Sequence, residues 1–384
     1  MRSRTLIGQA VRLALILLVL VFSAATFYFF DPPLIGRTDL AEYWGSAKLF
    51  VAGVNPYDES ALRVIQSDPQ IPLIGVRMWN PPAVLGVVAW LAFTPFPIAT
   101  ALWFALGIVS YVGAVIMLER WAGLRTTRTP LLLLCVLSSA PLVDALFYGQ
   151  IAPLLLLGFC GALAFENTNP RRAGVCLALT LLKPHLLFLP YLMLGLGCIS
   201  ASKTRLLMSA FVTAALVIFV LPLFWQPQIY SMYLEAFAAP PLNWRTPTLG
   251  SLLQGLSGID TLLVRSLPAL IAAGLLLARF PGGLTLNSAA MLSWVVPLSL
   301  VAAPYGWSYD QLLLLPSTFF LVRRGREIGG FQGWWIQISP LAANLLALGI
   351  SGISEMHHTI FYPVIFLLAG CLAQIRKGEG AELK

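Results

Sequence analysis

The chain has 384 residues, of which 58% are hydrophobic and only 10% are charged, whereas soluble domains carry about 25% charged residues. Such a chain cannot cover itself with polar side chains, so a soluble globular protein is excluded and an integral membrane protein is expected. The formal net charge of +8 does not indicate nucleic-acid binding, because the basic residues are clustered between apolar runs. The clusters are Arg2, Arg4 and Arg12; Arg171 and Arg172; Lys203 and Arg205; Arg323, Arg324 and Arg326; and Arg376 and Lys377. That distribution is typical of cytoplasmic loops, so both termini are expected in the cytoplasm.

The apolar runs predict an all-α polytopic protein. The first run, residues 13–30, is long enough to cross a hydrocarbon core of about 30 Å and is expected to be an uncleaved span. A first outer loop, 31–82, follows it. Further apolar elements are expected at 83–94, 97–118, 130–148, 150–165, 173–199, 206–224, 263–279, 286–303, 307–322, 334–353 and 360–375, with a second outer loop at 225–262 and a cytoplasmic tail at 376–384. We therefore expect a single polytopic domain over residues 1–384, with about ten to twelve transmembrane or re-entrant helices.

Two of these elements do not fit a simple alternation of spans. Residues 83–94 would form a helix of about 18 Å, too short to cross the membrane straight. The 173–199 element is broken by Lys183-Pro184 and has basic clusters on both sides, so a re-entrant hairpin is expected. Broken helices at membrane depth occur where they line a cavity or pack on protein, which indicates a site near this break.

The first outer loop predicts two helices. The first covers residues 38–53, with Thr38 or Asp39 able to cap its start and Gly53 suited to its end. Its apolar face carries Leu40, Tyr43, Trp44, Ala47 and Phe50, while Glu42, Ser46 and Lys48 point elsewhere. An amphipathic helix of this kind is expected to lie in the plane of the interface. A turn at 55–58 then leads to a second helix near 59–66, and Asn80-Pro81-Pro82 returns the chain to the membrane.

The order of several short motifs resembles glycosyltransferase family 87. The motifs are Asp39-x3-Tyr43, Gly53-x-Asn55-Pro56-Tyr57-Asp58, Trp79-Asn80-Pro81-Pro82, Tyr148-Gly149-Gln150, Leu182-Lys183-Pro184 and Ala303-Pro304-Tyr305-Gly306-Trp307-Ser308-Tyr309-Asp310. The resemblance covers roughly residues 10–375. It departs at Tyr309 and Asp310, where mycobacterial-type members tend to carry a histidine, so the role of that histidine does not carry over to this chain.

The resemblance implies a GT-C fold and an inverting transfer of a hexose, with mannose as the candidate sugar, from a polyprenyl-phosphate donor to an acceptor hydroxyl on a glycolipid or glycan. It places Asp39 as the general base, with Glu42 and Asp58 as nearby alternatives. From spacing alone, Asp39 is better explained as a helix cap, a role that is compatible with that of a base because a cap fixes the position of the carboxylate. No cofactor is expected, since the donor is the lipid itself. No metal site is expected either, because the five cysteines and three histidines have no metal-ligand spacing.

Cations are needed where the lipid phosphate departs. Lys183 and Arg245 are the candidates, with a snorkelling lysine and a solvated loop arginine as the alternatives. Asp310 is expected to contact the acceptor, to hold Lys183 or Arg245, or to cap a helix. The remaining candidate substrate-binding residues are Tyr309, Gln150, His185, Tyr43 and Asn80.

A transporter or flippase of a polyprenyl-linked sugar is the main alternative, because it would also use broken helices and buried charges. The absence of an internal repeat and the large aromatic outer loop argue against it. A second alternative is another GT-C activity with a different sugar. In each case the protein is expected to be a multi-pass protein of the plasma membrane, with its site facing the periplasm or the cell exterior.

Overall fold

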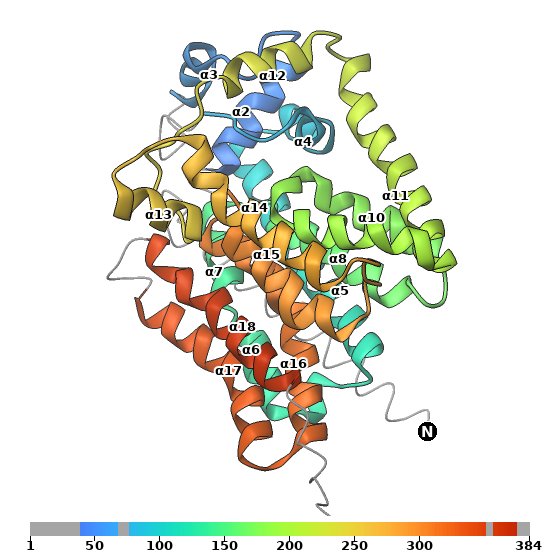
Figure 1. Ribbon diagram of the computed structural model, residues 1–384. Coiled ribbons are helices and arrows are strands. Elements are labelled where there is room, and N and C mark those ends of the chain that lie inside the picture. The colour runs from blue at the N-terminus through green and yellow to red at the C-terminus, as the bar shows by residue number, and fades with distance from the viewer. Residues whose placement is uncertain (1–38, 68–76, 351–355, 375–384) are drawn as a thin grey trace, which may run out of the picture. The chain divides into compact units, whose positions relative to one another are not determined.

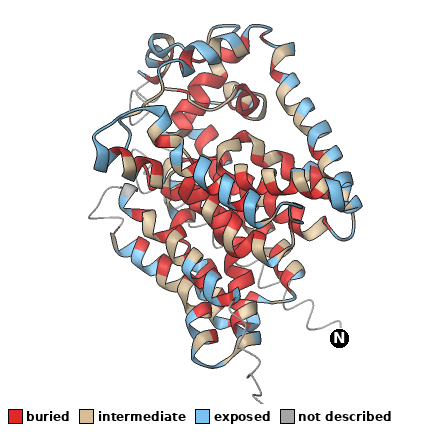
Figure 2. Cartoon of the chain, viewed as in Figure 1, coloured by how far each residue is buried: buried red, intermediate tan, exposed pale blue. Residues whose placement is uncertain are grey.

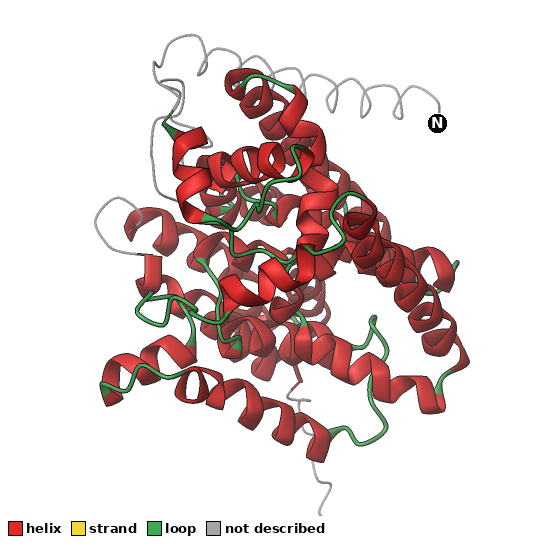
Figure 3. Cartoon of the chain, turned by 90° about the horizontal axis from the view of Figure 1, so that it is seen from above, coloured by secondary structure: helices red, strands yellow, loops and turns green. Residues whose placement is uncertain are grey.

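The computed structural model describes residues 39–67, 77–350 and 356–374. Over these ranges the chain forms helices and loops without a strand (Figure 3). The predicted all-α fold is therefore confirmed. The first apolar run at 13–30, the Thr38 cap and the tail at 376–384 lie outside the described residues.

The helices follow the predicted elements in chain order. They are α2 (Asp39–Val51), α3 (Glu59–Gln66), α4 (Pro82–Val88), α5 (Phe96–Ala122), α6 (Pro130–Leu137), α7 (Ala140–Tyr148), α8 (Ala152–Phe165), α9 (Pro170–Ala178), α10 (Phe188–Ser200), α11 (Ser202–Val220), α12 (Ile229–Phe237), α13 (Leu249–Ser257), α14 (Leu262–Arg279), α15 (Val296–Ala302), α16 (Leu315–Ile328), α17 (Gly330–Ile350) and α18 (Phe361–Gln374) (Figure 1). Short 3-10 segments join several of them: η1 (Ala89–Phe93), η2 (Thr126–Arg128), η3 (Leu179–Leu182), η4 (Pro184–Leu186), η5 (Leu221–Phe224), η7 (Ser308–Leu314) and η8 (Met356–Ile360). A π-helical turn, η6 (Met291–Val295), precedes α15.

Five helical stretches among the described residues are long and apolar enough to cross a membrane. They are Phe96–Ala122, Pro130–Tyr148, Ser202–Phe224, Leu262–Arg279 and Gly330–Ile350. Shorter apolar helices accompany them, among them Pro82–Phe93, which is short as the sequence predicted. The protein is thus a polytopic membrane protein.

Contacts divide the chain into two compact units. The first contains residues 1–113, 144–154 and 216–240, and the second contains residues 114–143, 155–215 and 241–384. The expectation of one polytopic domain stays a prediction.

In the first unit, α2 packs against η1, α3 and α4. Most of α2 is buried (Figure 2). The buried residues include two polar ones, since Glu42 is 4% exposed and Ser46 is 0% exposed. The polar face expected for this helix is therefore not exposed, because Glu42 and Ser46 are covered by protein. Its placement in the plane of the interface stays a prediction. The helix ends before Gly53, whose φ of 75° is readily adopted by glycine, as predicted.

The turn after α2 and the start of α3 are also as predicted. The backbone N–H of Asp58 donates to the carbonyl of Asn55, and the Asn55 side chain accepts from the N–H of Tyr57. Asp58 then caps α3 by accepting from the N–H groups of Ser60 and Ala61, which satisfies two of the donors left free at a helix start.

In the second unit, α16, α17 and α18 pack on one another. A Cβ built on Gly325 would lie 2.5 Å from the carbonyl oxygen of Gly333, so two glycines allow α16 and α17 to approach closely, as small residues do between membrane helices. The element expected at 307–322 is η7 followed by α16. Its residues from Ser308 to Val322 are all buried, and Trp307 is half-buried. This element forms part of the interior of this unit.

Candidate functional site

Asp39 is the first residue of α2 and is half-buried. Its carboxylate and that of Asp144 both act electrostatically on the hydroxyl of Tyr148, at the end of α7. A carboxylate in the first turn of a helix is favoured by the free N–H groups there. The position therefore holds a charged oxygen on a rigid element, which suits both a structural and a catalytic role.

Tyr43 lies one turn further along α2 and reaches the Tyr148-Gly149-Gln150 motif. Its hydroxyl donates a hydrogen bond of 3.0 Å to Oε1 of Gln150, and both side chains are buried. Gly149 has a φ of 73°, a left-handed conformation that ends α7. The structure thus brings together two of the predicted substrate-binding residues.

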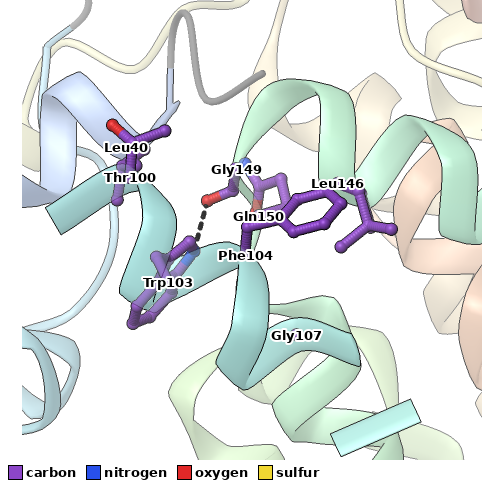
Figure 4. Close-up of a pocket in the computed structure, with 9 residues that line it drawn as sticks. Leu40, Thr100, Trp103, Phe104, Gly107, Leu146, Gly149 and Gln150 are labelled. Carbon is purple, nitrogen blue, oxygen red and sulfur yellow. Dashed lines mark hydrogen bonds between the residues drawn. The ribbon is translucent and has the colours of Figure 1, made fainter. Parts of the chain in front are cut away.

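A small pocket lies beside Gly149 and Gln150 and is lined by residues of α2, α5 and α7 (Figure 4). Trp103 of α5 stands against it, with its indole N–H donating to the carbonyl of Gly149 at 2.8 Å and its ring 5.8 Å from that of Tyr43. Leu40 and Leu146 contribute apolar wall. Gln150 is therefore fixed by the hydroxyl of Tyr43, and the preceding residue Gly149 is fixed by the indole of Trp103.

Asn80, the fourth candidate in the first unit, is held by Glu42. Oε1 of Glu42 accepts from Nδ2 of Asn80 at 3.1 Å and from the N–H of Trp79 at 3.4 Å. The carbonyl of Asn80 accepts from the hydroxyl of Tyr57. Burial raises the pKa of that hydroxyl well above its usual range, and a neighbouring carboxylate and tyrosines add to the shift. Glu42 therefore anchors the returning chain, while Asp58 caps α3, so both alternative carboxylates have structural partners.

In the second unit, the helix breaks at Lys183 as predicted. Lys183 has φ −136° and ψ 74°, outside the helical region, because the following proline disfavours a helical conformation of the preceding residue. Its side chain is only 5% exposed. The ammonium Nζ lies 2.9 Å from Oδ1 of Asp310 and 4.7 Å from the centre of the Tyr309 ring. The snorkelling alternative for Lys183 does not describe this geometry.

Asp310 uses its two oxygens for two partners. Oδ1 binds Lys183, and Oδ2 accepts from the backbone N–H of Trp307 at 2.9 Å, which closes the start of η7. Asp310 thus acts both as the partner of Lys183 and as a helix cap, which are two of the three roles that the sequence left open for it. His185 is half-buried and interacts electrostatically with both members of the ion pair. Lys183, His185, Tyr309 and Asp310 therefore form one cluster.

Arg245 lies outside that cluster, in the loop before α13. It is exposed, and its Nη1 would be 3.4 Å from a Cβ built on Gly255. The neighbouring Trp244 packs on Trp307 with 5.6 Å between the ring centroids. The loop of Arg245 is thus connected to the Asp310 segment through a pair of tryptophans.

One buried cation was missed in the sequence. Arg265 is fully buried in the first turn of α14 and hydrogen-bonds to five acceptors around it. The signal that could have identified it is a charged residue inside an apolar run, which is costly in a membrane protein. No three His, Cys, Asp or Glu side chains in the described parts of the chain lie close enough to share a metal ion.

The family model of glycosyltransferase family 87 matches residues 79–324, which is more than half of the chain. The match includes Asn80, Gln150, Lys183, Arg245 and Asp310, and begins after Asp39 and Tyr43. No curated protein matches the chain. No solved structure matches it either.

Proposed function

The chain belongs to glycosyltransferase family 87 and is a membrane glycosyltransferase, and we propose that it transfers a hexose, with mannose as the candidate sugar, from a polyprenyl phosphate to an acceptor hydroxyl. The acceptor in this proposal is a glycolipid or a glycan. The reaction takes place in the plasma membrane, on its periplasmic or outer face, which agrees with the basic clusters between the apolar runs.

The buried Lys183 carries the proposal for an anionic lipid donor. A lysine that is 5% exposed in an apolar protein is energetically costly unless it has a use. It is held by one carboxylate oxygen and one aromatic ring, so its charge is neutralised in the free enzyme and is available to a phosphate that competes with Asp310. Arg245 is exposed and supplies the second cation in this proposal.

The chemistry is a single displacement at the anomeric carbon. Asp39 accepts the proton of the acceptor hydroxyl while that oxygen forms a bond to the anomeric carbon. The bond between this carbon and the phosphate oxygen breaks on the opposite side, and polyprenyl phosphate leaves with its charge balanced by Lys183 and Arg245. One base is sufficient, and the configuration at the anomeric carbon is inverted. Tyr43, Gln150, Asn80, Tyr309, His185 and Asp310 are proposed to bind or orient the substrates.

The test uses the full-length protein in lipid vesicles with radiolabelled polyprenyl-phosphate-mannose and a membrane extract as the source of acceptor. Asp39→Asn is expected to lose transfer by about 10²- to 10⁴-fold, as a missing general base does. Glu42→Gln and Asp58→Asn are matched carboxylate controls, because each amide keeps an oxygen that accepts the hydrogen bonds observed here. Full activity in Asp39→Asn would contradict the role as base. Movement of label across the bilayer without transfer would instead indicate a lipid-sugar transporter.

A further inference from the structure

Arg265 has an unusual environment for a buried arginine. Its guanidinium is surrounded by neutral acceptors: the carbonyl oxygens of Pro304 (2.6 Å from Nε), Leu242 (3.1 Å from Nη1) and Trp244 (3.0 Å from Nη1), Oε1 of Gln254 (3.0 Å from Nη1) and Oγ1 of Thr246 (2.9 Å from Nη2). The ring of Tyr305 lies 3.9 Å from its Cζ. The carboxylate that acts on it electrostatically is that of the exposed Asp260.

These acceptors belong to three separate pieces of the second unit. One piece is the loop 242–246, another is α13, and the third is the segment that follows α15. A planar guanidinium with five N–H donors in a fixed arrangement can bind several acceptors at once, which a compact ammonium group cannot do equally well. Arg265 therefore joins three pieces of chain that have no common secondary structure.

Two of the joined pieces lead to the cations of the proposed donor site: the loop carries Arg245, and the segment after α15 leads to Asp310, the partner of Lys183. Arg245 directly follows Trp244, whose carbonyl Arg265 binds, and Trp244 packs on Trp307. The N–H of Trp307 in turn binds Asp310, the partner of Lys183. A continuous series of contacts thus connects Arg265 to Arg245 on one side and to the ion pair on the other.

The contact between α13 and α14 is also tight at this point. A Cβ on Gly250 would lie 2.0 Å from the carbonyl oxygen of Arg265, so the backbone of Arg265 and that of α13 touch directly. Both the main chain and the side chain of this residue therefore contribute to the same arrangement. In addition, Arg245 and Arg265 interact electrostatically as like charges, which favours an anion nearby.

We propose that Arg265 is a positioning residue for the donor site. It holds the loop 242–246 against the segment that begins at Pro304, and so fixes Arg245 and the Trp307–Asp310 turn in the arrangement that receives the lipid phosphate. This inference rests on the proposed function for the identity of the donor. The arrangement of the loop itself can be tested without any substrate.

The experiment compares wild type, Arg265→Gln and Arg265→Lys in lipid. Glu166→Gln is the matched control, because Glu166 is a buried charged residue of the same unit that binds a different loop through the N–H groups of Leu286 and Asn287, each at 2.8 Å. The first measurement is the rate of tryptic cleavage after Arg245, followed by mass spectrometry of the fragments. The second measurement is KM and kcat with radiolabelled polyprenyl-phosphate-mannose.

In Arg265→Gln we expect cleavage after Arg245 to accelerate by about tenfold and KM for the donor to rise by about tenfold, with a smaller change in kcat, as loss of a charge-assisted contact predicts. Arg265→Lys keeps the positive charge but lacks the planar guanidinium with its five N–H donors. Its cleavage rate and donor KM are therefore expected to lie between those of Arg265→Gln and wild type. Glu166→Gln is expected to lower the unfolding temperature while leaving both readouts unchanged.

Two results would overturn the proposal. Wild-type cleavage after Arg245 in folded Arg265→Gln would show that the loop does not depend on this residue, and faster cleavage with an unchanged donor KM would show that the loop does not serve the donor. If Arg265→Gln does not fold, Arg265→Lys is held to the same two criteria. Absence of transfer by the wild-type protein would contradict the proposed donor, and the cleavage rates would still decide whether Arg265 positions the loop.

Discussion

The Nζ atom of Lys183 lies 2.9 Å from Oδ1 of Asp310, and the two residues are 5% and 2% exposed. The partners are separated by 127 positions in the sequence, so the pair fixes the helix break at Lys183-Pro184 to the start of η7. A buried ion pair is weak evidence for stability in itself, because the desolvation of both charges opposes their attraction. In the proposed function, the pair is present because Lys183 supplies a cation for the donor phosphate.

Removal of one partner should be more damaging to stability than removal of both charges. Asp310→Asn removes the carboxylate that is paired with the buried ammonium of Lys183, which we expect to cost about 3–5 kcal/mol of unfolding free energy. The double variant Lys183→Met/Asp310→Asn removes both charges of this pair and keeps an acceptor for the N–H of Trp307, so it should recover most of this loss. Thermal unfolding in detergent measures both variants.

The transfer activity of the Lys183→Met/Asp310→Asn variant should differ from its stability. The double variant is expected to remain inactive although its stability is recovered, because the cation for the lipid phosphate is absent. Equal stability of the single and double variants would show that the two charges do not interact energetically. An active double variant would exclude Lys183 from donor binding.

The hydrogen bond between Tyr43 and Gln150 leads to a second prediction. Tyr43→Phe removes the hydrogen bond from the tyrosine hydroxyl to the buried Oε1 of Gln150, which we expect to destabilise the protein by about 1–3 kcal/mol. Tyr43→Phe/Gln150→Leu removes both polar groups and should unfold closer to wild type, since a fully apolar replacement can be nearly neutral. The measurement is again the unfolding temperature of the purified variants.

A comparison with Tyr57 tests whether the Tyr43 effect is specific. Tyr57→Phe also removes a tyrosine hydroxyl, but its acceptor is the backbone carbonyl of Asn80. If Gln150 contacts the substrate, Tyr43→Phe raises KM more than Tyr57→Phe, which removes a hydrogen bond to the backbone of Asn80 only. Identical kinetics of the two variants would contradict a role of Gln150 in binding.

Local features of the fold could be predicted from sequence because they depend on neighbouring residues. The bounds of α3, the cap at Asp58 and the break at Lys183-Pro184 follow from capping groups and proline. In contrast, the surroundings of α2 were predicted wrongly. Helical spacing places Glu42 off the apolar face, but it cannot show that Trp79 and Asn80 return to cover that carboxylate.

The candidate site was predictable in part for the same reason. Lys183 stood out as a charge in an apolar run, and a pairing with Asp310 was one of several alternatives. Tyr43 and Gln150 are 107 positions apart, and nothing in either local sequence indicates their contact. Arg265 escaped attention because its acceptors are mostly backbone carbonyls, which every residue carries and which therefore leave no pattern in the sequence.

The cap of α3 should give a pH-dependent stability. The hydrogen bonds from Ser60 and Ala61 lower the pKa of Asp58 below its usual value. A carboxylate whose pKa is lower in the folded state stabilises the fold above its unfolded pKa, and this contribution is lost as the pH falls through the folded pKa. Asp58→Ala should therefore weaken α3 at neutral pH, and the difference from wild type should disappear once the pH has fallen below the lowered pKa of Asp58 in the folded state.

Hydrogen exchange of the peptide that contains α3 measures this effect, after correction for the intrinsic exchange rate at each pH. Asp58→Asn is the control, because it keeps an oxygen acceptor and has no titration. A difference between Asp58→Ala and wild type that persists unchanged in acid would show that the charge of Asp58 does not contribute to the cap.

Substitution by alanine should have opposite effects on stability at Gly250 of α13 and at Gly274 of α14. A Cβ on Gly250 would meet the carbonyl oxygen of Arg265 at 2.0 Å, whereas a Cβ on Gly274 of α14 would meet no atom within 4 Å. Gly250→Ala must separate the two helices and is expected to cost about 1–3 kcal/mol, as overpacking does. Gly274→Ala should be neutral or stabilising by up to about 1 kcal/mol, because alanine favours the helix.

Since separation of the helices also moves the guanidinium of Arg265 away from the loop 242–246, Gly250→Ala should accelerate tryptic cleavage after Arg245 and Gly274→Ala should not. Equal unfolding temperatures and equal cleavage in the two variants would contradict the close approach of α13 to Arg265.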